Sequence, residues 1–322
     1  MKKFYTAESV TEGHPDKVCD QIADTILDAC LKGDSNSHVA CEVLATKVTV
    51  LLAGEISSSC EPDVLELAEG VVERIGYDPK DFLFDSLIHR QSPDIAEGVR
   101  VSREKRQNPA AEADWSMGAG DQGIMTGYAC RENPQMLPMP VLLANRIVRE
   151  LDAARKSEYI KGILPDGKAQ VTVEYEDHEP VRLDTVIVSC QHAEDKDLKD
   201  LEREIRQKVL LPALRPLPPD PETRIIINPS GRFVVGGMEA DTGLTGRKLK
   251  DDAYGVCLLG IYADGAAFGD ALGNVYRYSK KSIENREGIP SQKKTVSFGR
   301  LIYCNLWSVC IYQTKPADIH VS

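Results

Sequence analysis

The sequence lacks the features that mark membrane-spanning and secreted proteins. No apolar run approaches the ~20 residues needed to cross a bilayer, and residues 1–5 lack the apolar stretch of a signal peptide. The nine cysteines include no Cys-x-x-Cys pair, and several fall within apolar patterns, which favours buried free thiols over zinc ligands or disulfides. These absences predict a cytoplasmic protein with no membrane partner.

Basic residues are also in deficit. Lys and Arg number 39 against 50 Asp and Glu, and the net charge of −11 disfavours a nucleic-acid partner. It leaves room for a local basic pocket that binds a polyanion. With 322 residues, 42% of them hydrophobic and 28% charged, the chain has the composition of a globular protein with more than one domain.

The densest group of functional side chains is the segment 9–17, which reads SVTEGHPDK. The apolar residues that follow recur every four positions up to Cys30, and Gly33 follows them as a stop signal, so we expect a helix over 15–31. Pro15 suits its first position and His14 its cap, with Asp16 in the first turn. This helix start can bind an anion such as phosphate. Alternatively, Asp16 merely complements the helix dipole.

Two stretches of the chain share one order of predicted elements, namely helix, strand, strand, helix and strand. The first comprises helix 15–31, strands 38–45 and 47–56, helix 62–75 and the apolar run 82–84. The second comprises helix 138–154, strands 169–175 and 185–191, helix 195–211 and strand 224–227. The two stretches are not visibly similar in sequence, so the pattern predicts an α+β protein whose repeat is architectural.

A polar segment, 97–114, separates the two stretches. It is interpreted either as a surface linker or as a mobile lid over an active site. Beyond it, residues 118–123 match the dinucleotide pattern GxGxxG, but no buried strand precedes them and no helix pattern follows. A Rossmann site is therefore disfavoured, and the glycines are expected to let Asp121 approach a ligand.

Two later segments carry further candidate residues. Asp166, Gly167 and Lys168 form a predicted turn before a strand, and an ordinary solvated turn is the alternative interpretation. Over 228–248, glycines alternate with Arg232, Arg247 and Lys248, a composition suited to wrapping phosphates in backbone N–H groups and cations. No GxxxxGK[ST] sequence is present, so this is not a P-loop.

The motifs SVTEGHPDK, GAGDQG, PDGK, NPSGRF and DTGLTGRK, in this order, resemble those of the S-adenosylmethionine synthetase family over about residues 2–254. The resemblance implies an α+β fold of repeated units around a pseudo-threefold axis, with the third unit incomplete or altered here. The implied division is an N-terminal unit 1–92, a mobile polar loop 93–117, a central unit 118–228 and a C-terminal unit 229–322, atypical after about 255.

The resemblance also implies an activity. The family forms S-adenosylmethionine from ATP and L-methionine by attack of the methionine sulfur on the ribose C5′, and then releases phosphate and pyrophosphate. A thioether has no proton to lose, so the site needs cations and alignment of the reactants more than a general base. The family forms homodimers or homotetramers with active sites at the subunit interface.

Roles for individual residues follow from the resemblance alone. The catalytic set is His14, Lys168, Arg247 and Lys248. The ATP-binding set is His14, Asp121, Asp166, Gly167, Lys168, Arg232, Phe233, Asp241, Arg247 and Lys248. The methionine-binding set is Glu55, Gln91 and Asp241. Asp16 matches a Mg²⁺ ligand and Glu42 a K⁺ ligand.

The resemblance ends soon after Gly255. Residues 265–277 occupy the place of a glycine-rich strand and a loop that carries two lysines in the family, and both lysines are missing. Residues 256–322 hold 8 of the 19 aromatic residues and a charge of +3, against −14 before them. A shifted reading frame, a deletion and natural divergence each account for this change.

The altered end of the chain keeps two other functions open. The first is a non-catalytic or inactive nucleotide-binding homologue or subunit that lacks the phosphate-binding lysines. The second is an unrelated phosphotransferase, which transfers phosphate from ATP to an acceptor other than water.

Overall fold

The computed structural model describes residues 2–94, 101–110, 129–246, 258–262, 265–269 and 275–279. The chain divides into two compact units: Met1–Gln122 with Leu143–Thr245, and Gly123–Leu142 with Gly246–Ser322. The described strands of the second unit are β9 (Leu258–Tyr262), β10 (Gly265–Gly269) and β11 (Val275–Ser279), which form an antiparallel sheet in the order β11-β10-β9. No helix among the described residues has both the length and the apolarity of a membrane span.

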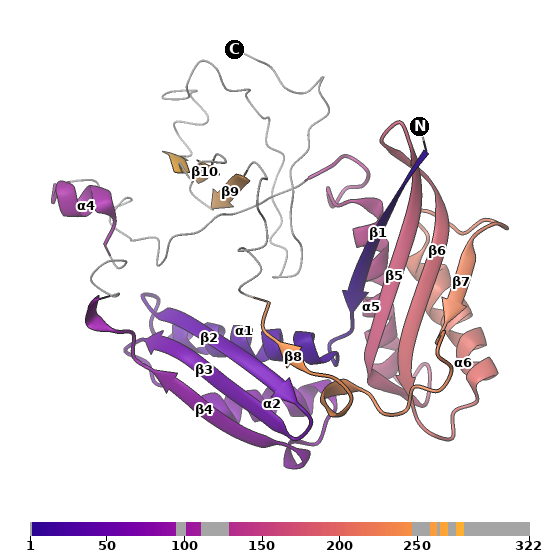
Figure 1. The fold of residues 1–322 in the computed structure, drawn as a ribbon, viewed down its shortest axis with the longest axis horizontal. Coiled ribbons are helices and arrows are strands. Elements are labelled where there is room, and N and C mark those ends of the chain that lie inside the picture. Colours follow the sequence, from indigo (N-terminus) through magenta and orange to yellow (C-terminus); the bar gives the residue numbers. More distant parts are fainter. Residues whose placement is uncertain are drawn as a thin grey trace. The chain divides into compact units, whose positions relative to one another are not determined.

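The first sheet of the larger unit has the order β4-β3-β2-β8. Its strands are β2 (His38–Thr46), β3 (Thr49–Ser57), β4 (Leu83–His89) and β8 (Gly243–Leu244). Helices α1 (Pro15–Gly33) and α2 (Val64–Ile75) lie together against one of its faces, and the short helix η1 (Pro79–Asp81) precedes β4 (Figure 1). Between helices and sheet lies an apolar core that includes Ile22, Ile26, Leu52, Val72 and Ile75.

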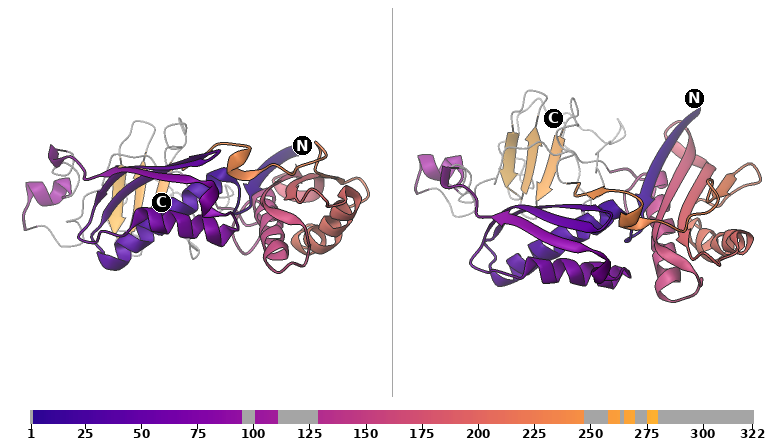
Figure 2. Two further views of the ribbon diagram at one scale, coloured as in Figure 1. Left: turned by 90° about the horizontal axis from the view of Figure 1, so that it is seen from below. Right: turned by 60° about the horizontal axis from the view of Figure 1, so that its bottom comes forward.

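The second sheet has the order β1-β5-β6-β7. Its strands are β1 (Lys2–Val10), β5 (Ile163–Glu176), β6 (Glu179–His192) and β7 (Arg224–Ile227). Figure 2 shows helix α5 (Met139–Lys156) and the helical segment 198–213 on one side of this sheet. The residues buried there include Leu143, Ile147, Val171, Val188 and Leu201.

The two sheets have the same topology. In each, a long antiparallel pair (β2–β3 or β5–β6) is followed by a strand that pairs in parallel (β4 or β7). In each, the fourth strand is antiparallel and comes from outside the repeated stretch, β8 in the first sheet and β1 in the second. The predicted order of helix, strand, strand, helix and strand is thus observed twice.

Local sequence accounts for the helix ends. His14 caps α1 and Pro15 occupies its first turn, as predicted, and the helix runs through Gly33 to a cap at Asp34. Asp63 caps α2 by accepting from the N–H groups of Leu65 and Glu66, and Gly76 ends that helix at a φ of 111°, which favours glycine. The helix predicted at 62–75 therefore begins two residues later.

Several predicted elements differ from the observed ones. The strands predicted at 169–175 and 185–191 extend over 163–176 and 179–192, because pairing with β1 and with each other continues through the polar residues. The turn predicted at 166–168 lies within β5, where the register shifts between Ile163 and Gly167. The run predicted at 82–84 extends to His89 as β4, and β1 was not predicted.

The helix predicted at 195–211 is interrupted. It consists of α6 (Leu198–Glu204), a wider π-helical turn η3 (Ile205–Leu210) and the short α7 (Leu211–Ala213). The wide turn ends two residues before Pro212, whose ring cannot accept the close approach of the carbonyl four residues earlier in an α-helix. Arg146 of α5 donates to the carbonyls of Pro212 and Ala213 at 3.2 and 2.8 Å.

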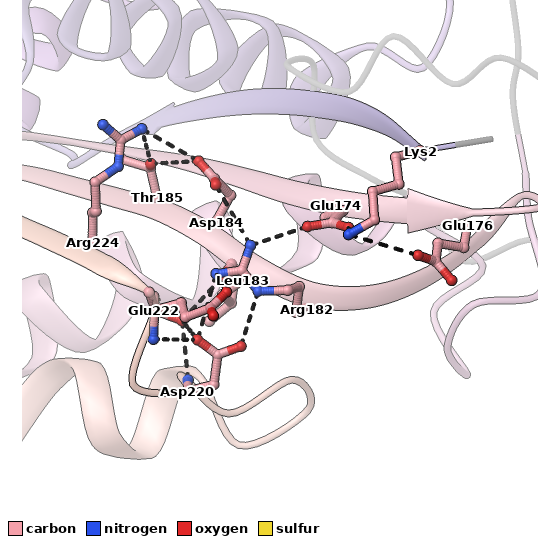
Figure 3. A network of polar contacts seen from close by, with 11 residues as sticks. Lys2, Glu174, Glu176, Arg182, Leu183, Asp184, Thr185, Asp220, Glu222 and Arg224 are labelled. Carbon is pink, nitrogen blue, oxygen red and sulfur yellow. Dashed lines mark hydrogen bonds and ion pairs between the residues drawn. The ribbon is translucent and has the colours of Figure 1, made fainter.

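An ion-pair network holds the far end of the second sheet (Figure 3). Glu174 of β5, with its side chain 4% exposed, contacts Lys2 of β1 at 2.6 Å and Arg182 of β6 at 3.1 Å. Arg182 also contacts Asp184 at 3.6 Å and Asp220 at 2.9 Å. Bonds to Arg182 hold the pKa of Asp220 down to about 2. The network attaches β1, an edge strand with little buried surface, to the rest of the sheet.

Two further predictions concern segments that are only partly described. The expected loop 93–117 is described at 93–94 and 101–110, and there it contains the short helix α4 (Arg103–Gln107). Cys19, Cys30, Cys41 and Cys190 are buried free thiols, as predicted, and Cys60 and Cys130 are half-buried. The GxGxxG segment and the three remaining cysteines lie outside the described residues.

Candidate functional site

The start of α1 presents the first candidate group. The backbone N–H of Asp16 donates to Nδ1 of His14 at 3.3 Å, which closes the helix cap. Because Nδ1 accepts this bond, the neutral imidazole carries its proton on Nε2 and offers a donor on its other edge. The carboxylate of Asp16 accepts from the N–H of Leu244 at 3.1 Å, so the start of α1 is held against β8.

Close backbone approaches bring the start of α1 to the start of β5. The N–H of Thr11 donates to the Gly167 carbonyl at 2.9 Å, and its hydroxyl donates to the Pro165 carbonyl at 2.7 Å. A Cβ on Gly13 would lie 2.3 Å from Cβ of Pro165, so only glycine fits there. The hydroxyl of Tyr77, which follows α2, donates to the Gly13 carbonyl at 2.6 Å.

The segment Gly237–Gly243 reaches the same place. The N–H of Gly237 donates to the carboxylate of Asp166 at 2.7 Å, and Gly237 has a φ of +61°, where a Cβ would meet the Tyr77 side chain. A Cβ on Gly243 would lie 2.2 Å from the Pro15 carbonyl carbon. Glycine at these positions lets three separate segments touch, and it brings the predicted residues of SVTEGHPDK, PDGK and DTGLTG together.

Asp166 lies at the centre of this contact and is 7% exposed. Burial raises the pKa of its carboxyl group, while the bond from Gly237 and the nearby His14 lower it, and Asp241 raises it further. Both His14 and Asp241 therefore act electrostatically on Asp166. We refer to the three carboxylates of Asp16, Asp166 and Asp241, together with the adjacent His14, as the central acidic group.

The two predicted cations of the described chain are held in exposed ion pairs. Lys168 follows Gly167 on β5 and pairs with Val10 of β1, and its ammonium group contacts the carboxylate of Glu8. Arg232 forms an exposed ion pair with Glu194 at 2.7 Å. Surface pairs of this kind are weakly held. Both cations can therefore exchange their carboxylate partners for a phosphate.

Two of the predicted methionine-binding residues, Glu55 and Gln91, and the predicted K⁺ residue Glu42 lie on or beside the first sheet. Glu42 on β2 and Glu55 on β3 project from the face of the first sheet that α1 and α2 leave open. Glu55 contacts His89 at 3.8 Å, and Glu42 accepts a hydrogen bond from the Thr245 hydroxyl. Gln91, just beyond β4, has a buried Oε1 with no hydrogen-bond partner among the described residues. Within the described chain, these contacts do not join Glu55 or Gln91 to the central acidic group.

Three predicted residues cannot be placed. Asp121, Arg247 and Lys248 lie outside the described residues. In addition, the described part of the chain holds no group of three or more His, Cys, Asp or Glu side chains arranged to bind a metal ion.

The sequence did not predict the contacts that hold the segment 9–17 against the end of α5. Glu12 contacts Arg155 at 2.5 Å and Lys156 at 2.6 Å, both at the end of α5, and its N–H donates to Asp152 at 3.2 Å. Glu12 belongs to the SVTEGHPDK motif and was available as a candidate. Its partners were not, because they lie 140 or more positions further along the chain.

The comparisons with known proteins agree with these motifs. Residues 2–93 match the family model "S-adenosylmethionine synthetase, N-terminal domain", and residues 116–233 match "S-adenosylmethionine synthetase, central domain". Among curated relatives, the S-adenosylmethionine synthase of Clostridium botulinum (strain Alaska E43 / Type E3) is 45% identical over 262 residues, which cover 79% of this chain and 67% of the relative.

Two further relatives give the same result. The S-adenosylmethionine synthase of Synechococcus elongatus is 44% identical over 269 residues, covering 78% of this chain and 64% of its own length. That of Staphylococcus epidermidis is 45% identical over 262 residues, covering 79% and 66%. The chain thus spans about two thirds of the length of the curated relatives that it matches. With both domain models matched in order, the chain belongs to the S-adenosylmethionine synthetase family.

Proposed function

We propose that this chain is a methionine adenosyltransferase, a transferase that forms S-adenosylmethionine from ATP and L-methionine. The observation that carries the proposal is the convergence of the α1 start, the start of β5 and the 237–243 segment on the central acidic group. These three segments are distant in sequence and carry the motifs that match the family.

The geometry suits a reaction in which charge, not proton removal, is the difficulty. The sulfur of methionine attacks C5′ of the ribose and the triphosphate leaves, so negative charge must be stabilised on the leaving group. The start of α1 offers backbone N–H groups and the positive end of a helix dipole, and His14 offers its Nε2–H. Lys168 and Arg232 supply cations from the described chain, and Arg247 and Lys248 are predicted to add two more.

Mg²⁺ and K⁺ are proposed cofactors. Asp16 fits Mg²⁺ because its side chain is 38% exposed and only one of its oxygens accepts from Leu244. When bound, Mg²⁺ would neutralise phosphate charge beside His14. We propose Glu42 as the K⁺ ligand, beside the hydroxyl of Thr245. The oxygen atoms of a carboxylate and a hydroxyl suit a hard cation.

We propose that the active enzyme is a homodimer or homotetramer in which a second copy completes the site. The open face of the first sheet carries Leu83, Leu87 and Leu244, which are 70%, 60% and 54% exposed. Such an apolar face is typical of a protein interface. Glu55 lies on this same face, away from the central acidic group, so a partner copy packed here would bring the proposed methionine residues Glu55 and Gln91 to an interface site.

The unit arrangement and the location of the enzyme are further parts of the proposal. The shared topology of the two sheets supports a pseudo-threefold arrangement in which 229–322 supplies an altered third unit. The divisions at 1–92, 93–117 and 118–228 remain predictions. We place the enzyme in the cytoplasm, where ATP and methionine are available and where thiols such as Cys190 stay reduced.

A turnover assay tests the proposal. Purified chain is incubated with ATP, L-methionine, Mg²⁺ and K⁺, and S-adenosylmethionine is measured by chromatography together with ATP binding by calorimetry. Asp16→Asn should lower turnover by about 100-fold. Asp28→Asn, an exposed change on the same helix, should not lower it. ATP binding without product would instead identify a non-catalytic homologue, and phosphate transfer to another acceptor would identify a different phosphotransferase.

A further inference from the structure

The end of β6 holds the segment 228–237 through its side chains. Asn228 accepts from the N–H of Cys190 at 2.8 Å and donates to its carbonyl at 3.0 Å, through the amide of its own side chain. This pairing extends the parallel ladder that β6 and β7 form up to Val188 and Ile227. Asn228 has a φ of 45°, a conformation that asparagine tolerates better than most residues. The segment therefore leaves β7 in a fixed direction.

His192, the last residue of β6, forms hydrogen bonds with both polar backbone groups of Phe233. Its N–H donates to the Phe233 carbonyl at 2.9 Å, and its Nε2 accepts from the Phe233 N–H at 3.0 Å. Nδ1 faces the Ala193 carbonyl at 2.8 Å, which can only accept, so Nδ1 carries the proton. These contacts fix a single neutral tautomer of His192, a residue that is only 2% exposed.

Gln191 joins the same segment to Asp166. Its Nε2 donates to the Val234 carbonyl at 3.0 Å, and its Oε1 accepts from the Asp166 N–H at 3.3 Å. A Cβ on Gly236 would lie 2.7 Å from Cδ of Gln191, so the chain passes directly over this amide. Gln191 is 7% exposed. Its amide thus fixes the distance between the central acidic group and the segment that carries Arg232 and Phe233.

We propose that His192, with the support of Gln191, is a positioning residue that sets Phe233 and Arg232 for nucleotide binding. The proposal rests on the proposed function, because it assigns ATP to the segment 228–237. The proposal assigns His192 no direct contact with the substrate. His192 acts through the backbone of Phe233, whose orientation would otherwise depend on a loop segment with three glycines.

Two substitutions separate positioning from packing. His192→Asn keeps a donor near the place of Nδ1 but removes the acceptor for the Phe233 N–H. His192→Gln reaches further and restores an acceptor near the place of Nε2. His178→Asn, in the exposed hairpin turn between β5 and β6, controls for the loss of an imidazole. All variants are first compared by thermal unfolding, and the later measurements are made at a temperature at which both His192 variants are folded.

Two measurements are then made on each folded variant. Hydrogen–deuterium exchange of a peptide covering 229–237 reports on the Phe233 N–H, and calorimetry reports the Kd for ATP. His192→Asn should speed exchange in this peptide and weaken ATP binding by about 10-fold, as expected for one buried hydrogen bond. His192→Gln and His178→Asn should stay near wild type in both measurements.

The possible outcomes are distinguishable. Unchanged exchange in His192→Asn overturns the proposal, and so does faster exchange with unchanged ATP affinity. Equal losses in His192→Asn and His192→Gln reduce the role of His192 to packing and also overturn it. A wild-type chain that binds no ATP contradicts the proposed function, and the exchange comparison alone then decides whether His192 holds the segment.

Discussion

Asp152, in α5, offers a direct test of how the second sheet holds the segment 9–17. Its Oδ2 accepts from the N–H of Glu12 at 3.2 Å, and its Oδ1 is buried with no hydrogen-bond partner among the described residues. Burial, and after it the charge of Glu12, raises the pKa of Asp152 from 3.8 to about 7. Arg155 and Lys156 offset this only in part. The carboxylate form is therefore costly in the folded protein.

The sign of the pH effect follows from these two pKa values. Between about pH 4 and pH 7 the folded protein holds a proton on Asp152 that the unfolded chain has released. Raising the pH therefore favours the unfolded chain, and the contribution of Asp152 to stability falls as pH rises through about 7. At about 1.4 kcal/mol for each pH unit, the free energy of unfolding should drop by about 2–3 kcal/mol between pH 5 and pH 8.

Asp152→Asn removes this titration and keeps an oxygen that can accept from Glu12. Urea unfolding of both proteins at pH 5, 6, 7 and 8 gives the difference in unfolding free energy, in which the other titrating groups cancel. This difference should move in favour of the variant by about 2–3 kcal/mol from pH 5 to pH 8. Asp28→Asn, an exposed change in α1, is the matched control for the loss of one carboxylate.

The reasoning would be refuted by a pH-independent difference between Asp152→Asn and wild type. A variant that loses stability relative to wild type as pH rises would refute it as well, since that sign belongs to a carboxylate stabilised by Arg155 and Lys156. The first result would mean that the positive charges of Arg155 and Lys156 cancel the effect of burial on Asp152, and the second that they exceed it.

Three other changes test separate contacts. Leu87→Glu should convert the oligomer to monomers, as measured by light scattering. Leu211→Glu on α7 is the control, because Leu211 is 61% exposed and Leu87 is 60% exposed, and it should leave the mass unchanged. Equal effects of the two changes would contradict an interface on the open sheet face. Gly13→Ala should lower the free energy of unfolding in urea by about 1–3 kcal/mol, because the new Cβ meets Pro165. Gly70→Ala, in α2, where a new Cβ meets nothing within 4 Å, should raise it by about 1 kcal/mol. The reverse order would exclude the close approach at Gly13. Tyr77→Phe should lose about 1 kcal/mol with its bond to Gly13, and an unchanged midpoint would show that this bond contributes nothing.

Sequence reasoning succeeded where the physical cause is local. The cap at His14, the first-turn Pro15 and the four-residue apolar period predicted the start and the buried face of α1. The glycine-rich motifs were predicted to meet a ligand or a phosphate, whereas the close approaches of chain to chain at Gly13, Gly237 and Gly243 were not predicted. The convergence of these motifs came from the family resemblance, because spacing along the chain does not show which segments meet.

Sequence reasoning failed where long-range pairing decides the structure. The alternation in Lys2–Val10 is polar, so it predicts no buried strand, yet β1 forms because β5 offers a partner edge 158 or more positions later. Pairing with β6 at Ile163 and again at Gly167 carries β5 across the Pro165-Asp166-Gly167 sequence that favours a turn. Glu12 and His192 were missed for this reason, since their importance depends on partners that only the completed sheets supply.

The edge strand β8 is synthesised long after β2, the strand with which it pairs, and this delay affects folding on the ribosome. β2 pairs with β8 through Ala45 and Gly243, so its free edge waits for nearly 200 further residues, or ~10–40 s of synthesis. During that time the first sheet exposes an unpaired strand edge that other chains can join. Release of the chain before residue 244 would leave that edge open for good, so premature termination there should yield aggregates rather than a smaller folded protein.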